Sequence, residues 1–140
     1  GDGGRGIVIQ DINASPQACM STIKNVGSYA GLVPHVLAAD VYSTDTAPDG
    51  TSSIKAKLKA GMYGFNYEYF LHLIHRPAEN TLTWTLDYTR RSDIDDSVGH
   101  WQVEAHPHKR YGWTRVFYST ELALPKMIPS FVINYLTKNV

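Results

Sequence analysis

The sequence predicts an α+β protein in which a curved antiparallel sheet is crossed by a helix near the C-terminus. Three strand-like runs follow one another in the second half of the chain, Thr81–Tyr88, Val98–His106 and Trp113–Ala123. The last run leads through prolines into a tail, Ile128–Val140, whose apolar residues recur at helical spacing. A sheet that grips a helix encloses a space between the two elements. We therefore expect the functional site in that space.

Length, charge and cysteine content indicate the class of protein. The 140 residues fit a single core, so we expect one domain over residues 7–140 after a flexible tail at residues 1–6. Thirteen basic and thirteen acidic side chains balance, which argues against a nucleic-acid partner. The sequence has no run of about 20 apolar residues, the length that predicts a membrane span. The single cysteine, Cys19, cannot form an internal disulfide, which favours an intracellular or organellar protein over a secreted one.

The N-terminal part of the chain predicts one strand and two short helices. Alternating residues over Gly6–Asn13 predict the strand. Ser15 is suited to cap a helix and Pro16 to occupy its first position, so we expect the first helix to begin here. A second short helix is expected through Tyr29 and Leu32, up to the next proline. These helices would connect the first strand to the rest of the sheet.

Three more strands are expected in the middle of the chain. Leu37–Thr46 alternates with period two, and a Pro-Asp-Gly turn separates it from Thr51–Gly61. In Thr51–Gly61 apolar residues alternate with lysines, which predicts a half-buried strand with a basic, solvent-facing side. Its basic residues are Lys55, Lys57 and Lys59. Gly64–Arg76 is apolar on both sides, and its density of Tyr and Phe favours a strand over a helix.

Three motifs resemble cofactor or metal sites but lack an essential part. The glycines of residues 1–6 have the dinucleotide-binding spacing, yet they precede a strand where the motif must open a helix. Asp93–Ser97 resembles the start of a calcium loop, but Val98 stands where glycine is required. His106 and His108 lack the further ligands that zinc needs, so a surface turn is the better interpretation. We therefore predict no cofactor and no metal.

The sequence offers no convincing catalytic constellation. It has no nucleophile elbow, no Cys/His pair and no phosphate-binding loop. Asp87 and His35 are the candidates for an acid or base in a pocket, and solvent-facing or capping roles are favoured for both. We therefore assign no catalytic residue, and the interpretation leans away from an enzyme.

Six short segments, taken in order, resemble a known superfamily. They are Ala14-Ser15-Pro16, Tyr29–Pro34, Leu82-x-Trp84, Gly99–Val103, Arg115–Tyr118 and Ile128–Phe131. Their order is similar to that of the START-like (SRPBCC) superfamily, and within it to the polyketide cyclase/dehydrase and coenzyme Q-binding branch. The resemblance implies a helix-grip fold, with a curved antiparallel sheet of about seven strands wrapped around a long C-terminal helix. The family's last helix usually runs longer than Pro129–Val140 allows, so a truncated helix is expected here.

The resemblance also implies a hydrophobic cavity, and it leaves three functions open. The superfamily includes carriers and cyclases, and fold alone does not choose between them. Without an acid–base pair, we rank first a carrier that binds a lipid, sterol, quinone or isoprenoid-like molecule. A non-catalytic regulatory or assembly module with a protein partner comes second, and a polyketide cyclase third. Transient contact with a membrane surface through the three lysines is a further expectation.

The side chains expected to contact the ligand are mostly aromatic residues on the predicted strands. They are Tyr67, Tyr69, Trp84, Leu86, Tyr88, Trp101, Val103, Phe117, Phe131 and His35. The period-two pattern places Trp84 and Trp101 on one face of the sheet. The polar ends of Tyr67, Tyr88 or His35 would orient the polar end of the ligand.

Overall fold

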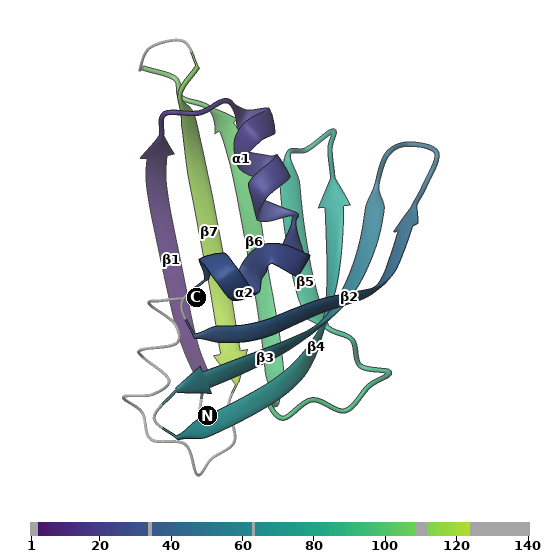
Figure 1. The fold of residues 1–140 in the computed structure, drawn as a ribbon. Helices are drawn as coiled ribbons and strands as arrows, with labels where there is room; N and C mark the ends of the chain where they lie inside the picture. The colour runs from purple at the N-terminus through teal and green to yellow at the C-terminus, as the bar shows by residue number, and fades with distance from the viewer. Residues whose placement is uncertain (1–2, 34, 63, 109–111, 124–140) are drawn as a thin grey trace.

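The described residues form a seven-stranded antiparallel sheet with short helices on one of its faces (Figure 1). The computed structural model describes residues 3–33, 35–62, 64–108 and 112–123. The strands are β1 Gly3–Ile12, β2 Val36–Thr46, β3 Ser52–Met62, β4 Phe65–Arg76, β5 Thr81–Leu86, β6 Asp96–Ala105 and β7 Thr114–Ala123. The helices are α1 Pro16–Ile23, the short 3₁₀ helix η1 Val26–Ser28, and α2 Tyr29–Leu32.

The sheet has the order β1-β7-β6-β5-β4-β3-β2, so β1 and β2 form its two edges. Each strand from β2 to β7 pairs with the next one along the chain, and β1 closes the order by pairing with β7. The sheet curves around α1 and α2, which lie across its concave face (Figure 1). This confirms the predicted curved antiparallel sheet. The predicted C-terminal helix, with Phe131, lies outside the described residues.

Strand β1 begins earlier than the sequence predicted. Residues 3–6 pair in register with residues 120–123 of β7, so the prediction of a flexible tail is wrong for them. Three of these four residues are glycines, which have no side chain. The alternation of apolar and polar side chains that predicts the rest of the strand is therefore absent here. The backbone N–H and C=O groups of glycine nevertheless form ladder hydrogen bonds as those of any other residue do.

The start of α1 follows from its capping residue. Ser15 has extended backbone angles, and its side-chain oxygen accepts a hydrogen bond from the Ala18 N–H at 3.1 Å. Pro16 occupies the first helical position, as expected. Helix α1 then directs Cys19 and Met20 into the core that it shares with the sheet.

Replacing Ser15 by Ala is expected to lower the free energy of unfolding by about 1 kcal/mol, because the Ala18 N–H loses its acceptor. Urea denaturation followed by circular dichroism measures the change. Ser21→Ala in the exposed part of the same helix is the control, and its effect is expected to be small. Equal effects of the two substitutions would contradict the capping role.

One core lies between the concave face and the helices. Its buried members are Cys19, Met20, Val26, Val36, Ile54, Ala56, Leu58, Tyr67, Leu71, Leu73, Leu82, Trp84, Leu86, Ile94, Val103, Val116 and Tyr118. On β3 the buried residues alternate with the three lysines, so Lys55, Lys57 and Lys59 project from the convex face as predicted. Lys57 forms an ion pair of 2.7 Å with Glu68 of β4 there. Within the described residues, no helix has the length and apolarity that crossing a membrane requires.

Candidate functional site

An aromatic cluster occupies the concave face on three neighbouring strands. Trp84 lies on β5, Trp101 on β6 and Tyr118 on β7. The Tyr118 ring centroid is 4.3 Å from that of Trp101 and 6.0 Å from that of Trp84. The two tryptophans therefore share one face of the sheet, which confirms the predicted register. Trp101 is only partly buried, so this cluster has a side that a ligand can reach.

The orientation of Trp84 is fixed by its cross-strand partner, Gly99. The two residues lie opposite each other on β5 and β6. A Cβ atom at Gly99 would lie 1.9 Å from Cζ2 of Trp84, so the indole covers the place that a side chain would take. The indole Nε1 donates a hydrogen bond to Oγ of Ser97 at 3.2 Å, in a buried position. The ring is therefore held flat along β6.

Three tyrosine phenols gather in the same region. Burial raises the pKa of Tyr29 and of Tyr69, and the nearby Tyr118 adds to the increase in both cases. Burial also raises the pKa of Tyr118 to about 12, although the neighbouring Thr120 hydroxyl acts in the opposite direction. The three hydroxyls therefore keep their protons at neutral pH and act as hydrogen-bond donors. Tyr29 uses its hydroxyl within the protein, donating to the carbonyl oxygen of Ile23.

Two buried hydroxyls in this interior are unpaired. The Oη atoms of Tyr67 and Tyr118 are shielded from solvent, and neither has a hydrogen-bond partner among the described residues. Folded proteins pair the large majority of buried polar side-chain atoms. Each unpaired hydroxyl costs about 1–3 kcal/mol relative to its hydrated state. The concave face therefore combines an aromatic lining with two free polar groups.

The structure brings together most of the side chains that the sequence placed around a ligand. Facing the concave side are Tyr67, Tyr69, Trp84, Leu86, Trp101 and Val103. His35 lies between α2 and β2 with a positive φ of 70°, and its carbonyl accepts a hydrogen bond from the Gly61 N–H. A role in binding stays a prediction for all seven residues.

Phe117 faces the other side of the sheet, so its predicted place in the ligand site is wrong. It lies opposite Ile9 of β1 and Gln102 of β6, whereas the next residue, Tyr118, lies opposite Trp101. Neighbouring residues of a strand point to opposite faces. An error of one residue therefore placed the outer residue, Phe117, on the inner face. The inner residue, Tyr118, was missed.

Tyr88 lies outside the sheet, and its prediction as a ligand contact is also wrong. Strand β5 ends at Leu86, two residues earlier than predicted. Tyr88 is 67% exposed, and its hydroxyl donates to Oδ1 of Asp96 at 2.7 Å. The chain leaves the sheet after Asp87, whose side chain accepts hydrogen bonds from the N–H and the hydroxyl of Thr89.

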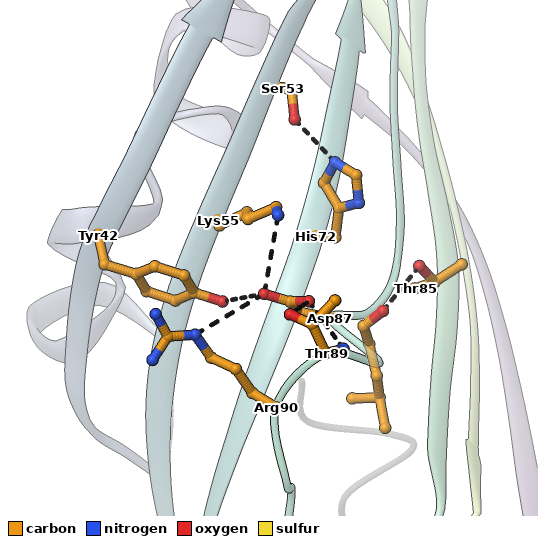
Figure 2. A network of polar contacts seen from close by, with 9 residues as sticks. Tyr42, Ser53, Lys55, His72, Thr85, Asp87, Thr89 and Arg90 are labelled. Carbon is orange, nitrogen blue, oxygen red and sulfur yellow. Dashed lines mark hydrogen bonds and ion pairs between the residues drawn. The ribbon is translucent and has the colours of Figure 1, made fainter.

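Asp87 is the centre of a polar network on the convex face (Figure 2). Its carboxylate is buried and accepts hydrogen bonds from the hydroxyls of Tyr42 and Thr89, both at 2.6 Å. Lys55 and Arg90 approach the same carboxylate to 4.0 and 3.9 Å. Hydrogen bonds from Thr89 and then from Tyr42 lower the pKa of Asp87 to about 2. This candidate acid therefore stabilises a loop and does not face the aromatic interior.

His75 is an ionisable group of the interior that the sequence interpretation did not select. It lies opposite Leu82 in the β4–β5 pair, on the same side as Leu73 and Trp84, and is buried. Burial, with the charge of Lys24 nearby, lowers the pKa of His75, so its imidazole is neutral at pH 7. The alternation through Tyr67, Leu71 and Leu73 contained the signal that would have placed it there.

His106 belongs to a second network at the other end of the sheet. Its Nε2 lies 3.0 Å from Oδ2 of Asp11 and 2.9 Å from Nη2 of Arg115. The ring is more enclosed than the predicted surface turn implied, because Asp11 of β1 and Arg115 of β7 lie against it. Within the described part of the chain, no group of three or more His, Cys, Asp or Glu residues could hold a metal ion.

Solved structures with the same architecture are found at low sequence identity. A START superfamily protein from Mycobacterium smegmatis is 14% identical, and the match covers 96% of this chain and 87% of that one, with a TM-score of 0.73. An aromatase/cyclase from Streptomyces is 11% identical over 99% of this chain and 84% of its own, also with a TM-score of 0.73. The chain has a START-like fold.

A plant protein extends this comparison. The START-like chain also matches a major latex-like protein from Panax ginseng, at 11% identity and a TM-score of 0.61, over 98% of this chain and 93% of that one. No protein-family model and no curated protein matches the sequence. The likeness at these identities concerns the fold, and it confirms the START-like sheet architecture that the resemblance implied.

Proposed function

We propose that this START-like protein binds a hydrophobic small molecule against its concave face and carries it without transforming it. The observation that supports the proposal is the aromatic cluster of Trp84, Trp101 and Tyr118, which lies beneath the helices and stays partly accessible at Trp101. Aromatic and apolar lining with a few polar groups is typical of small-molecule sites. The START-like fold of the solved relatives supports the same interpretation.

The distribution of charge favours a carrier over a cyclase. Among the described residues, Asp87 is the one buried carboxylate, and its hydrogen bonds hold it in the convex-face network. A cyclase needs a placed acid or base beside its substrate. His75 is the interior group that fits this need best, because its neutral imidazole can accept a proton. Cyclisation with His75 as the base is therefore the second candidate function.

Membrane contact is a subsidiary part of the proposal. Two of the three convex-face lysines, Lys55 and Lys57, lie near carboxylates of the protein itself, at 4.0 Å from Asp87 and 2.7 Å from Glu68. Lys59 is exposed. Contact with an anionic membrane surface would therefore depend on Lys59 more than on its neighbours.

The binding proposal is tested by native mass spectrometry of the full chain mixed with oleic acid, farnesol, cholesterol or a short-chain ubiquinone. We expect at least one compound to be retained with one molecule per protein and released with its mass unchanged. Trp101→Leu should weaken that binding about tenfold, which is about 1.4 kcal/mol, because it removes an aromatic surface of the site. Phe117→Leu, the matched change on the convex face, should leave the affinity within about twofold.

Two outcomes would contradict this proposal. If none of the four compounds is retained, the carrier function is wrong. If a linear polyketide, added as a fifth compound, is released with a changed mass, and His75→Gln abolishes the change, the cyclase interpretation replaces it.

A further inference from the structure

We infer that the hydroxyls of Tyr67 and Tyr118 hold the ligand, and that the ligand carries carbonyl or hydroxyl oxygen in the part buried against the sheet. This inference rests on the proposed function and narrows it. It favours an oxygenated polycyclic or quinone-like molecule over a hydrocarbon chain whose polar end stays at the surface. The support comes from a comparison with other tyrosine hydroxyls of this chain, which form hydrogen bonds within the protein.

Three tyrosines outside the proposed anchor pair use their hydroxyls within the protein. Tyr29 donates to the carbonyl of Ile23, Tyr42 to the carboxylate of Asp87, and Tyr88 to that of Asp96. Each of those three hydroxyls donates to an acceptor of the protein, and this hydrogen bond holds the segment that carries the acceptor. A buried hydroxyl without such a partner is therefore an exception in this molecule.

Tyr118 is one of the two exceptions in the interior. It is 5% exposed, and its ring centroid lies 6.0 Å from that of Trp84 and 4.3 Å from that of Trp101. The Thr120 hydroxyl is near enough to lower its pKa, but no group among the described residues has the distance and angle of a hydrogen bond to its Oη. Its phenol keeps its proton at neutral pH, so it offers a donor. A ligand that stacks on the aromatic cluster would bring an oxygen atom to this donor.

Tyr67 is the other exception. It is 7% exposed, lies opposite Ala60 near the start of β4, and stacks against Phe65 with a centroid separation of 6.4 Å. Its Oη is likewise buried and unpaired among the described residues. A third unpaired hydroxyl, that of Thr81, lies opposite Arg76 in the β4–β5 pair and so belongs to the other face. Among the described residues, the buried and unpaired hydroxyls of the concave face are therefore those of Tyr67 and Tyr118.

The test compares two probes of nearly the same shape, beta-naphthol and beta-methylnaphthalene, by fluorescence titration of the full chain. The wild-type protein and the double variant Tyr67→Phe/Tyr118→Phe are measured with both probes. We expect the double variant to weaken beta-naphthol binding about tenfold and to leave beta-methylnaphthalene within about twofold, because only the first probe can pair with a phenol. The single variants Tyr67→Phe and Tyr118→Phe show how much of the loss of beta-naphthol affinity each hydroxyl accounts for. Tyr88→Phe, on the exposed loop, should change neither affinity.

The outcomes separate this inference from the proposed function. If neither probe binds the wild-type protein, the inference fails, while the proposed function is decided separately by oleic acid, farnesol, cholesterol and the short-chain ubiquinone. If both bind and the double variant weakens them equally or not at all, binding stands and the anchor assignment is wrong. The unliganded double variant should also be at least as stable as the wild type, because no internal hydrogen bond is removed. A loss of stability would show that the hydroxyls have a structural partner and would overturn the inference.

Discussion

Replacing Gly99 by Ala is expected to lower the free energy of unfolding by about 3 kcal/mol, an effect at the upper end of the usual range for one added methyl group in a packed core. The new Cβ would lie 1.9 Å from Cζ2 and 2.3 Å from two further ring atoms of Trp84. The indole cannot move away without losing its hydrogen bond to Ser97 and its contact with Tyr118. Guanidinium denaturation measures the loss.

Gly27→Ala is the matched control for Gly99→Ala. At Gly27 the nearest atom to an added Cβ is Cγ2 of Val41, at 3.9 Å, so the change is expected to stay within about 0.5 kcal/mol. A double-mutant cycle with Trp84→Leu sharpens the test. The clash predicts that Trp84→Leu costs less in the Gly99→Ala background than in the wild type. Strictly additive effects would show that Gly99 is not required by the indole.

Replacing Asp87 by Asn is expected to destabilise the protein by about 2 kcal/mol at pH 7. The carboxylate accepts hydrogen bonds from Tyr42 and Thr89, and hydrogen bonds to a charged group contribute about 1.5–3 kcal/mol each when the group is buried. Asp87→Asn removes one carboxylate oxygen as an acceptor, and because Asp87 is 4% exposed, water cannot take the place of that acceptor. Asp95→Asn, which removes an exposed carboxylate of the same loop, should have little effect.

The pH dependence provides a second measurement on Asp87. Its folded pKa of about 2 is below the ordinary value of 3.8, so the folded state binds the proton less readily than the unfolded state does. The stabilisation is therefore complete above pH 4 and is lost as the pH falls toward 2. The difference in unfolding free energy between the wild type and Asp87→Asn should shrink over this interval. A difference that stays constant down to pH 2 would contradict the assigned role.

Local sequence pattern predicted the sheet well where the alternation was complete. The lysines of β3 and the aromatic residues of β4 fall on the faces that period two assigned to them. The pattern failed at the start of β1, where glycines carry no signal, and at Phe117, where the next residue, Tyr118, is also aromatic. It also missed the two bulges of β2, at Val36/Ala38 and Val41/Ser43, which shift the alternation along that strand.

The features of the site that depend on distant pairs could not be read from the sequence. Tyr42 and Asp87 are separated by 45 positions, and two other strands, β4 and β3, lie in the sheet between β5 and β2. The covering of Gly99 by Trp84 depends in the same way on the register of two strands. Local periodicity gives the face of a residue but not its partner across the sheet. For this reason the aromatic lining was predicted and the unpaired state of its hydroxyls was not.

The indole N–H signals of the three tryptophans test the central claim most directly. Trp84 and Trp101 lie on the concave face, and Trp113 precedes β7 outside the core cluster. Oleic acid, farnesol, cholesterol and a short-chain ubiquinone are each added to isotope-labelled protein, and a two-dimensional proton–nitrogen NMR spectrum is recorded. We expect at least one compound to shift the Trp84 and Trp101 signals and to leave Trp113 in place. If none of the four moves the Trp84 and Trp101 signals, or if Trp113 alone responds, the concave face is not the binding site.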